Sequence, residues 1–70
     1  MPDFGEKVVR IEDVHCRKAT EKAICVKIPE LGIDQWIPQS QIDDDSEVYK
    51  EGDVGTLVIS EWIAEKKELR

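Results

Sequence analysis

The sequence predicts a small, mainly β protein. We expect a curved antiparallel sheet, or a partly open SH3-like or OB-like barrel, of four to five strands with one C-terminal α-helix. Three observations predict it: short runs rich in β-branched residues, turn residues between these runs, and a final segment that begins with a helix-capping serine. The chain of 70 residues, 1–70, forms one domain because it is long enough to bury only one small core.

The first half of the chain is typical of a β-hairpin. Residues 6–16, "EKVVRIEDVHC", are rich in β-branched side chains, and the polar stretch "RKATEK" separates them from "AICVKI" at 23–28. In this second run the larger aliphatic side chains fall on one face by alternation, as expected for a sheet with one side on a core. These side chains are Ile24, Val26 and Ile28.

The alternation in the first run is interrupted. Val9 and Ile11 share one face of an ideal strand, whereas Val14 lies on the other. A β-bulge adds one residue to a strand and so moves the following side chains to the opposite face. We therefore expect a bulge near Glu12.

A short third strand is predicted at 34–37, "DQWI". Pro29 ends the second strand, and Leu31-Gly32 is typical of a turn. Pro38 then ends regular pairing because proline has no amide hydrogen to donate.

A last strand is predicted at 54–60, "VGTLVIS", after the turn signal Gly52-Asp53. Leu57 and Ile59 share one of its faces. The strand should therefore contribute these two side chains to the core.

The end of the chain predicts a helix over about 60–69. Ser60 is a favourable N-cap, and the acidic Glu61 in the first turn with basic residues near the end matches the helix dipole. Trp62 and Leu69 are seven residues apart and so share one stripe of an ideal helix. We expect the helix to dock on the sheet through Trp62, Ile63 and Leu69, since so short a helix is marginal in water.

The acidic stretch 42–55, "IDDDSEVYKEGDVG", raises the question of a metal site. An EF-hand calcium loop needs glycine at its sixth position and a carboxylate at its twelfth. A loop beginning at Asp43 places Val48 and Val54 at these positions. We therefore expect a solvated acidic connection and no metal site.

Cysteine and histidine also fail to form a recognisable site. His15, Cys16 and Cys25 supply three soft ligands, whereas a structural zinc site needs four. Neighbours in a strand point to opposite faces, so His15 is badly placed to activate Cys16. We expect no catalytic residues and no cofactor.

Charge and hydropathy argue against two further classes of protein, those that bind nucleic acid and those that span membranes. The net charge is −6, and residues 43–53 alone carry −5, because six acids there are opposed by one lysine. This acidity disfavours binding to a phosphate backbone. The chain shows neither a basic leader followed by an apolar run nor an apolar stretch of membrane-spanning length, so we expect a cytoplasmic protein with reduced thiols and no membrane contact.

One resemblance covers most of the chain. The stretch "TEKAICVKI" together with "WIPQSQIDDDSEVYKEGDVGTLVISEWIAEKK" resembles a group of small uncharacterised bacterial and phage proteins. Their pattern has the form "WIPxSQI", "DDSEV", then "GDxGxLVxxEW", and the similarity spans residues 20–68. It implies a stand-alone β-rich module, in some cases encoded by phage or prophage. This chain departs from the pattern at Cys25, where leucine is commoner, and in its longer "PELGID" turn.

The preferred hypothesis is a non-enzymatic binding module that acts through contacts with an unknown protein partner. Both tryptophans, Trp36 and Trp62, are expected to pack in the core, because large aromatics within apolar runs usually do. If one is exposed, it is Trp36, on an edge interrupted by proline. The proposed surface is then Trp36 with Ile37, Gln39 and Gln41.

Two alternatives remain open. An OB-like face could bind single-stranded nucleic acid, with Trp36 stacking on a base and cations contacting phosphates; these cations are Arg17, Lys18, Lys22 and Lys27. Clustering of the cations beside Trp36 would favour this reading. The protein would otherwise be a structural homodimer joined through the Trp62 helix or an open strand edge, so its state is monomer or homodimer.

Overall fold

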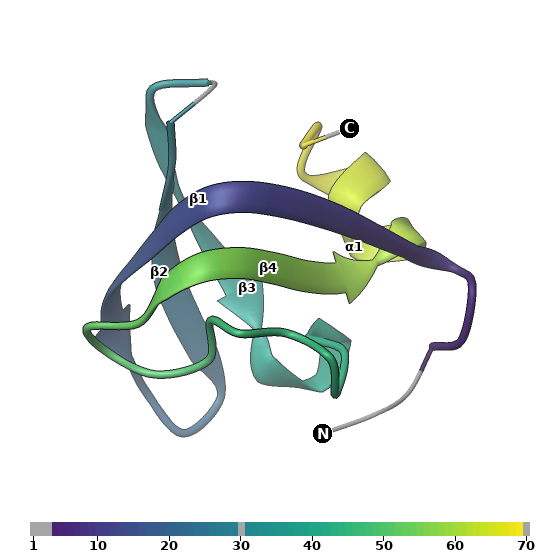
Figure 1. Ribbon diagram of the computed structural model, residues 1–70, viewed down its shortest axis with the longest axis horizontal. Helices are drawn as coiled ribbons and strands as arrows, with labels where there is room; N and C mark the ends of the chain where they lie inside the picture. The colour runs from purple at the N-terminus through teal and green to yellow at the C-terminus, as the bar shows by residue number, and fades with distance from the viewer. Residues whose placement is uncertain (1–3, 30, 70) are drawn as a thin grey trace.

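The computed structural model describes residues 4–29 and 31–69, which form a four-stranded antiparallel sheet followed by one short helix (Figure 1). The strands are β1 (Val8–Ala19), β2 (Ala23–Ile28), β3 (Ile33–Pro38) and β4 (Val54–Ser60). A 3₁₀ turn, η1 (Gln39–Gln41), follows β3, and the helix α1 (Glu61–Lys66) follows β4. The strand order is β3-β2-β1-β4, and within the described residues the sheet is open. The mainly β prediction is confirmed.

β1 bends and pairs with both of its neighbours. Its first part pairs with β4 and its last part with β2, so one strand joins the two halves of the sheet. The register with β4 shifts between Ile11 and Val14, which confirms the bulge predicted near Glu12. Asp13, within the bulge, has a φ of 58°, a left-handed conformation that aspartate adopts more readily than most residues. The first strand also runs past its predicted end at residue 16.

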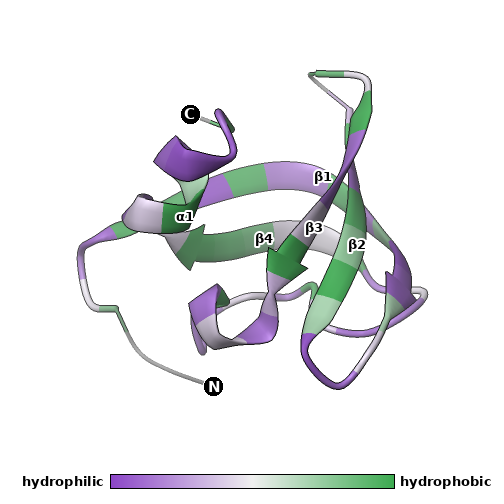
Figure 2. Cartoon of the chain, turned by 180° about the vertical axis from the view of Figure 1, so that it is seen from behind, coloured by the Kyte–Doolittle hydropathy of each residue, from purple (hydrophilic) through white to green (hydrophobic). Residues whose placement is uncertain are grey.

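The core is built from aliphatic side chains, which follow the hydrophobic stretches of β2 and β4 (Figure 2). Its fully buried members are Val14, Cys16, Ile24, Val26, Ile37, Ile42, Val48, Leu57, Ile59 and Ala64. The prediction that the tryptophans pack in the core is wrong, because Trp36 is 46% exposed and Trp62 is 58% exposed. In β3 the inward position belongs to Ile37, so alternation turns its neighbour Trp36 outward.

The helix is shorter than predicted, because α1 ends at Lys66 and not at residue 69. Glu68 has a φ of 57°, and the amide of Leu69 donates to the carbonyl of Ala64 at 2.8 Å. This left-handed residue with its backward hydrogen bond is a Schellman ending. It folds Leu69 onto the core, whereas Trp62 stays exposed, so the predicted stripe joining these two side chains does not form.

The acidic stretch begins with a segment that lies along the outer edge of β4. We call residues 42–48 the edge cover. Ile42 forms a β-bridge with Ile59, and the chain reaches this point through η1 directly from β3, at the opposite edge of the sheet. Further along, the amide of Glu47 donates to the carbonyl of Thr56 at 3.0 Å, and the amide of Thr56 donates to Glu47 Oε1 at 2.8 Å. The edge cover therefore occupies backbone groups that β4 would otherwise expose.

Ser46 is the buried polar centre of the edge cover. Its Oγ accepts hydrogen bonds from the amides of Val58 at 3.2 Å and Val48 at 3.3 Å, and it donates to the carbonyl of Val48 at 2.9 Å. Only 6% of Ser46 is exposed, and Val48 and Val58 are fully buried. Ser46 thus supplies the acceptor that the buried amide of Val58 requires.

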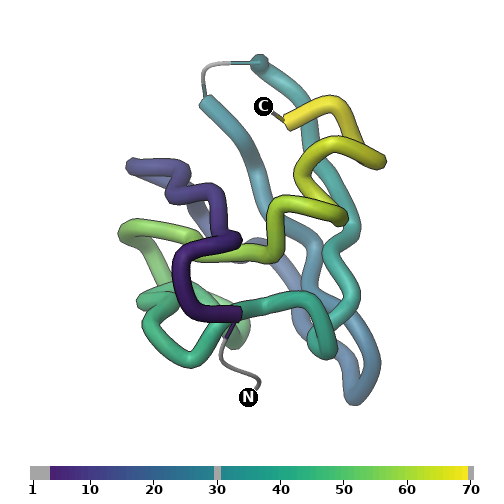
Figure 3. Tube along the Cα trace, turned by 90° about the vertical axis from the view of Figure 1, so that its right-hand side faces the viewer, coloured from purple at the N-terminus to yellow at the C-terminus, as the bar shows by residue number. Residues whose placement is uncertain are grey.

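Asp43 attaches the start of the described chain to the edge cover. Its Oδ2 accepts from the amide of Phe4 at 2.7 Å, which brings the two segments together (Figure 3). Its Oδ1 accepts from the amide of Asp45 at 2.9 Å. These two hydrogen bonds favour the charged carboxylate and hold the pKa of Asp43 below its ordinary value of 3.8. The first aspartate of the acidic run is therefore a structural residue.

Candidate functional site

The outward face of β1, β2 and β3 brings an exposed tryptophan close to cationic side chains. Lys18, Cys25 and Trp36 are paired with one another across the three strands and form one row. Their neighbour Ile24 is buried, so alternation directs Cys25 and its row away from the core. Because cysteine is small, its place between two long side chains leaves a depression between strands that lie two strand spacings, or about 10 Å, apart.

This depression is a hollow of about 360 Å³, which we call the trough. It is lined by Arg17, Lys18, Cys25, Asp34 and Trp36. Arg17 Nη1 lies 3.8 Å from Asp34 Oδ2, and both side chains are about half exposed. An ion pair of this kind contributes less than about 1 kcal/mol to stability. Its consequence here is positional, since it orients the guanidinium toward β3.

The cations expected to contact nucleic acid are only partly brought together. Arg17 and Lys18 line the trough beside Trp36. Lys27 lies one row away, opposite Asp34. Lys22 lies in the turn between β1 and β2, where its carbonyl accepts from the amide of Gln39 at 2.8 Å, and it does not line the trough.

The four residues of the predicted protein-binding surface do not share one exposed edge. Trp36 is exposed, but Ile37 is fully buried in the core and is removed from the surface by strand alternation. Gln39 Nε2 donates to the carbonyl of Thr20, which ties η1 to the turn between β1 and β2. Gln41 is half-buried at the other end of η1. Trp36 is therefore the member of this set that stays on an open surface.

Sequence reasoning missed Cys25 and Asp34 as lining residues. The alternation of β2 already directed Cys25 outward. What it did not provide was the partner of each strand residue, because an extra residue in β1, at Arg17, shifts the register against β2. Without that register the pairing of Lys18 with Cys25 could not be derived.

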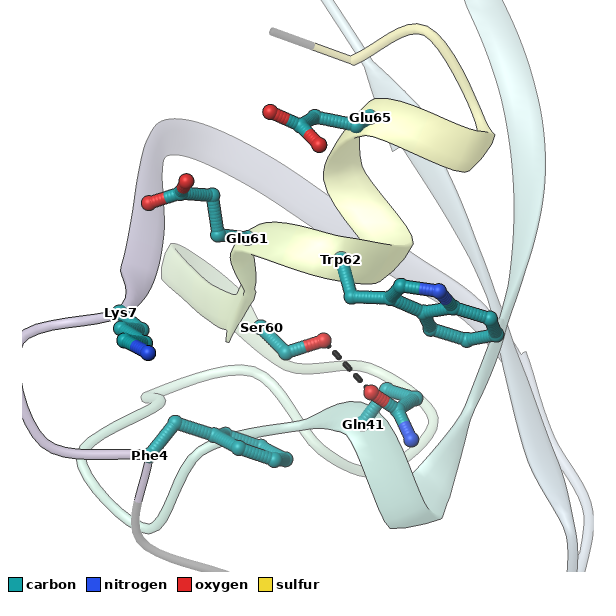
Figure 4. Close-up of a pocket in the computed structure, with 7 residues that line it drawn as sticks. All are labelled: Phe4, Lys7, Gln41, Ser60, Glu61, Trp62 and Glu65. Carbon is teal, nitrogen blue, oxygen red and sulfur yellow. Dashed lines mark hydrogen bonds between the residues drawn. The ribbon is translucent and has the colours of Figure 1, made fainter.

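Gln41 belongs to a second hollow, of about 370 Å³ (Figure 4). The hollow is lined by Phe4, Lys7, Gln41, Ser60, Glu61, Trp62 and Glu65. Ser60 Oγ donates to Gln41 Oε1 at 2.6 Å and accepts from the amide of Ile63 at 3.2 Å, which confirms Ser60 as the N-cap of α1. Lys66 Nζ lies 4.8 Å from the Trp62 ring centroid, a cation–π contact that engages this indole within the chain itself.

The sheet separates His15 from Cys16, whereas Cys25 lies on the same outward face as His15, one row away. His15 is exposed, whereas Cys16 is fully buried, as expected for neighbours in a strand. Burial, followed by the nearby Asp53 carboxylate, raises the pKa of the Cys16 thiol, which donates to the carbonyl of Lys18 at 3.3 Å. Neither Cys16 nor Cys25 forms a disulfide. Within residues 4–29 and 31–69, no group of three or more potential ligand side chains is arranged to hold a metal ion.

The outer edge of β3 carries apolar side chains. β3 is the terminal strand of the sheet. Leu31, Ile33 and Trp36, which lie on β3 and the turn before it, are each more than 40% exposed.

None of the helices that the structure describes has the length and apolar character to cross a bilayer.

Comparisons with known proteins do not identify a family. No family model matches the chain, and neither the curated proteins nor the solved structures contain a significant match to it. The features of the molecule that bear on its function are the trough, the open edge of β3 and the charges around them.

Proposed function

We propose that this protein is a non-enzymatic binding module that acts through contacts with another protein, and that the trough and the adjoining edge of β3 form its contact surface. The observation that carries the proposal is the exposure of Trp36 on an edge strand, beside the cations Arg17 and Lys18. Apolar side chains gathered on an exposed strand edge favour pairing with another chain. Tryptophan and arginine are also the residues most enriched among energetically dominant interface contacts.

A non-enzymatic role is favoured by the chemistry of the trough. Its thiol, Cys25, lies opposite Lys18 and Trp36, whereas His15 is opposite Lys27 in the next row. Among the residues that line the trough there is no histidine to act as a general base toward the thiol. The trough is also broad and solvated, and so offers little of the water exclusion that most catalysis uses.

We also propose a barrel-like shape for the sheet. We take the bent sheet to be a partly open SH3-like or OB-like barrel, supported by the sharing of β1 between two strand pairs and by the passage of η1 from β3 to the edge of β4. We also retain the resemblance to the small bacterial and phage proteins as a proposed relationship. A phage-related binding module is the function that this resemblance favours.

The proposal is tested by affinity capture from a host lysate with the tagged protein, its Trp36→Ala variant and its Tyr49→Ala variant. Tyr49 is the matched control, because it is 43% exposed and has Lys50 Nζ 5.7 Å from its ring centroid, so it offers an aromatic and a cation elsewhere on the surface. We expect one partner that is retained by the wild-type protein and by Tyr49→Ala and is lost with Trp36→Ala. Equal capture by all three folded proteins would contradict the proposal.

A second candidate is the binding of single-stranded nucleic acid on the same face. The specific observation in its favour is that Arg17 and Lys18 line one hollow with Trp36, as base stacking with phosphate contacts requires. Binding of a labelled oligonucleotide should then be measurable at ~50 mM salt and should weaken steeply as the salt concentration rises. Absence of binding at the low salt concentration would eliminate this candidate.

A third candidate is a homodimer joined through the open edge of β3. An antiparallel pairing of two such strands would extend the sheet and cover the exposed side chains of Ile33 and Trp36. Light scattering over a range of protein concentrations would detect it. A monomer at every concentration would remove this candidate.

A further inference from the structure

We infer that the partner presents an extended acidic segment to the trough, with an apolar side chain against Trp36 and, two residues along on the same face of the segment, a carboxylate between Arg17 and Lys18. This inference rests on the proposed function and adds the chemistry of the partner. It is carried by the row Lys18, Cys25 and Trp36, whose members are paired across three strands on the outward face.

The shape of the trough fits a side chain that enters from above. The small side chain of Cys25 forms the floor, with the indole of Trp36 on one side and the ammonium of Lys18 on the other. The strands that carry these two walls are two strand spacings, or about 10 Å, apart, so the gap between the walls accepts one inserted side chain but not a helix, whose diameter is about 10–12 Å with its side chains. An extended segment, whose side chains project one by one, meets this constraint.

The charges of the trough favour a carboxylate. Arg17 and Lys18 contribute two positive charges, and Asp34 contributes one negative charge, which leaves a net charge of +1 among the lining residues. Lys27 adds a further positive charge in the next row. A carboxylate placed here makes charge-assisted hydrogen bonds, which are stronger than neutral ones.

The same surroundings disfavour a long polyanion. The amide of Cys16 donates to the carbonyl of Asp53 at 2.8 Å, and the amide of Gly52 donates to the carbonyl of Cys16 at 3.0 Å. These bonds bring the end of the acidic stretch, with the carboxylate of Asp53, against β1 at Cys16, the neighbour of Arg17. A nucleic-acid strand that follows the sheet past the trough meets this negative charge, whereas one or two carboxylates remain among the cations.

The binding experiment uses three fluorescent probes: an acidic peptide of about eight residues that places two valines and two glutamates by turns on one face, with serine at the positions between them, the same peptide with lysine in place of glutamate, and an oligothymidylate. Fluorescence anisotropy is measured with the wild-type protein and with Lys18→Glu, Trp36→Ala and Lys50→Glu. Lys50 is the matched control, since it is also an exposed lysine beside an exposed aromatic ring. Circular dichroism verifies that each variant is folded.

We expect the acidic peptide to bind and the lysine peptide not to bind. Lys18→Glu and Trp36→Ala should each weaken the binding of the acidic peptide by about 10-fold or more. Lys18→Glu removes a charge contact that is desolvated in the complex, and Trp36→Ala removes an aromatic contact that is buried there. Lys50→Glu should change the affinity by less than about 2-fold, because the charge lies outside the trough.

A chemical footprint locates the peptide independently. Cys25 is half-buried at the floor of the trough, and its alkylation by iodoacetamide should slow by about 5-fold or more when the acidic peptide is bound, because the peptide blocks access to the sulfur. Cys16 is buried and its pKa is raised, so it serves as the internal reference that reacts slowly with or without peptide. Mass spectrometry of the digested protein measures both rates.

Three outcomes would overturn the inference: no binding of the acidic peptide, equal losses in Lys18→Glu and Lys50→Glu, or binding of the oligothymidylate in place of the acidic peptide. If the acidic peptide does not bind while the capture of a lysate partner is still lost with Trp36→Ala, the inferred chemistry of the partner is wrong and the proposed function stands. If no captured protein depends on Trp36, the proposed function itself fails.

Discussion

The two edges of this sheet differ in whether another segment of the chain covers them. Along β4, the edge cover of residues 42–48 bonds to the strand from Ile59 to Thr56 and buries Ile42 and Val48. Along β3, the terminal strand of the sheet, Ile33 and its neighbours are exposed. Since open edges invite pairing with other chains, the contrast separates a structural edge from one available for recognition.

The contrast also explains where the charge lies. The acidic stretch begins with the edge cover, where buried Ser46 and Asp43 make structural hydrogen bonds and Asp44 and Asp45 remain in solvent. Arg17, Lys18 and Lys27 lie instead on the outward face near β3. The net charge therefore describes this face poorly, because the acidic stretch, which carries −5 of the net −6, begins at the β4 edge.

The largest expected difference between the edges is in the stability that is lost when an isoleucine is replaced by alanine. Ile42→Ala, in the edge cover, should lower the free energy of unfolding by about 2–5 kcal/mol, because it leaves a cavity in the core. Ile33→Ala, on β3, should change it by less than about 0.5 kcal/mol, since this side chain is 42% exposed. Urea denaturation measures both. Equal losses would mean that the β3 edge is also packed.

The next effect concerns the polar centre of the edge cover. Ser46→Ala removes the acceptor of the buried Val58 amide and should cost about 1–3 kcal/mol of unfolding free energy. Ser40→Ala, at an exposed position in η1, is the control and should stay within about 0.5 kcal/mol. Urea denaturation gives the energies, and hydrogen exchange at Val58 should accelerate in Ser46→Ala. Unchanged exchange there would show that β4 does not depend on this serine.

A smaller effect should appear as a pH dependence. The folded pKa of Asp43 lies below its unfolded value, so the carboxylate stabilises the protein above the ordinary pKa of 3.8, and this contribution is lost as the pH falls through the folded pKa. Asp43→Asn should therefore flatten the decline of the thermal midpoint between about pH 5 and pH 2. Asp44→Asn is the control for the loss of one charge in the same stretch. A decline as steep in Asp43→Asn as in Asp44→Asn would remove the proposed role of the Phe4 amide.

The smallest expected effect on stability is at the trough. Trp36→Ala should change the free energy of unfolding by no more than about 0.5 kcal/mol, because the indole lies on the outward face of an edge strand. Intrinsic fluorescence would at the same time report the remaining Trp62. A loss comparable to that of Ile42→Ala would show that the indole is packed, and the contrast between the edges would then disappear.

Much of the local structure follows from the order of the residues. The bounds of β2 and β4, the bulge near Glu12 and the Ser60 cap were all derived from alternation, turn residues and capping chemistry. These features depend on neighbours a few residues apart, so a short stretch of chain contains the information. The expectation of a tryptophan core was wrong, and the exposure of Trp36, on which the candidate surface depends, had been only the alternative to it.

The sequence by itself determined a β-rich chain with one short capped helix, an aliphatic repeat for its core and a concentrated acidic stretch. Only the tertiary structure decided that the first part of this stretch covers β4, that Ile37 and not Trp36 faces inward, and that Cys25 lies between Lys18 and Trp36. The physical reason is register. Which residues meet across strands is determined by bulges and by long-range packing, and a shift of one residue exchanges the buried face for the exposed one.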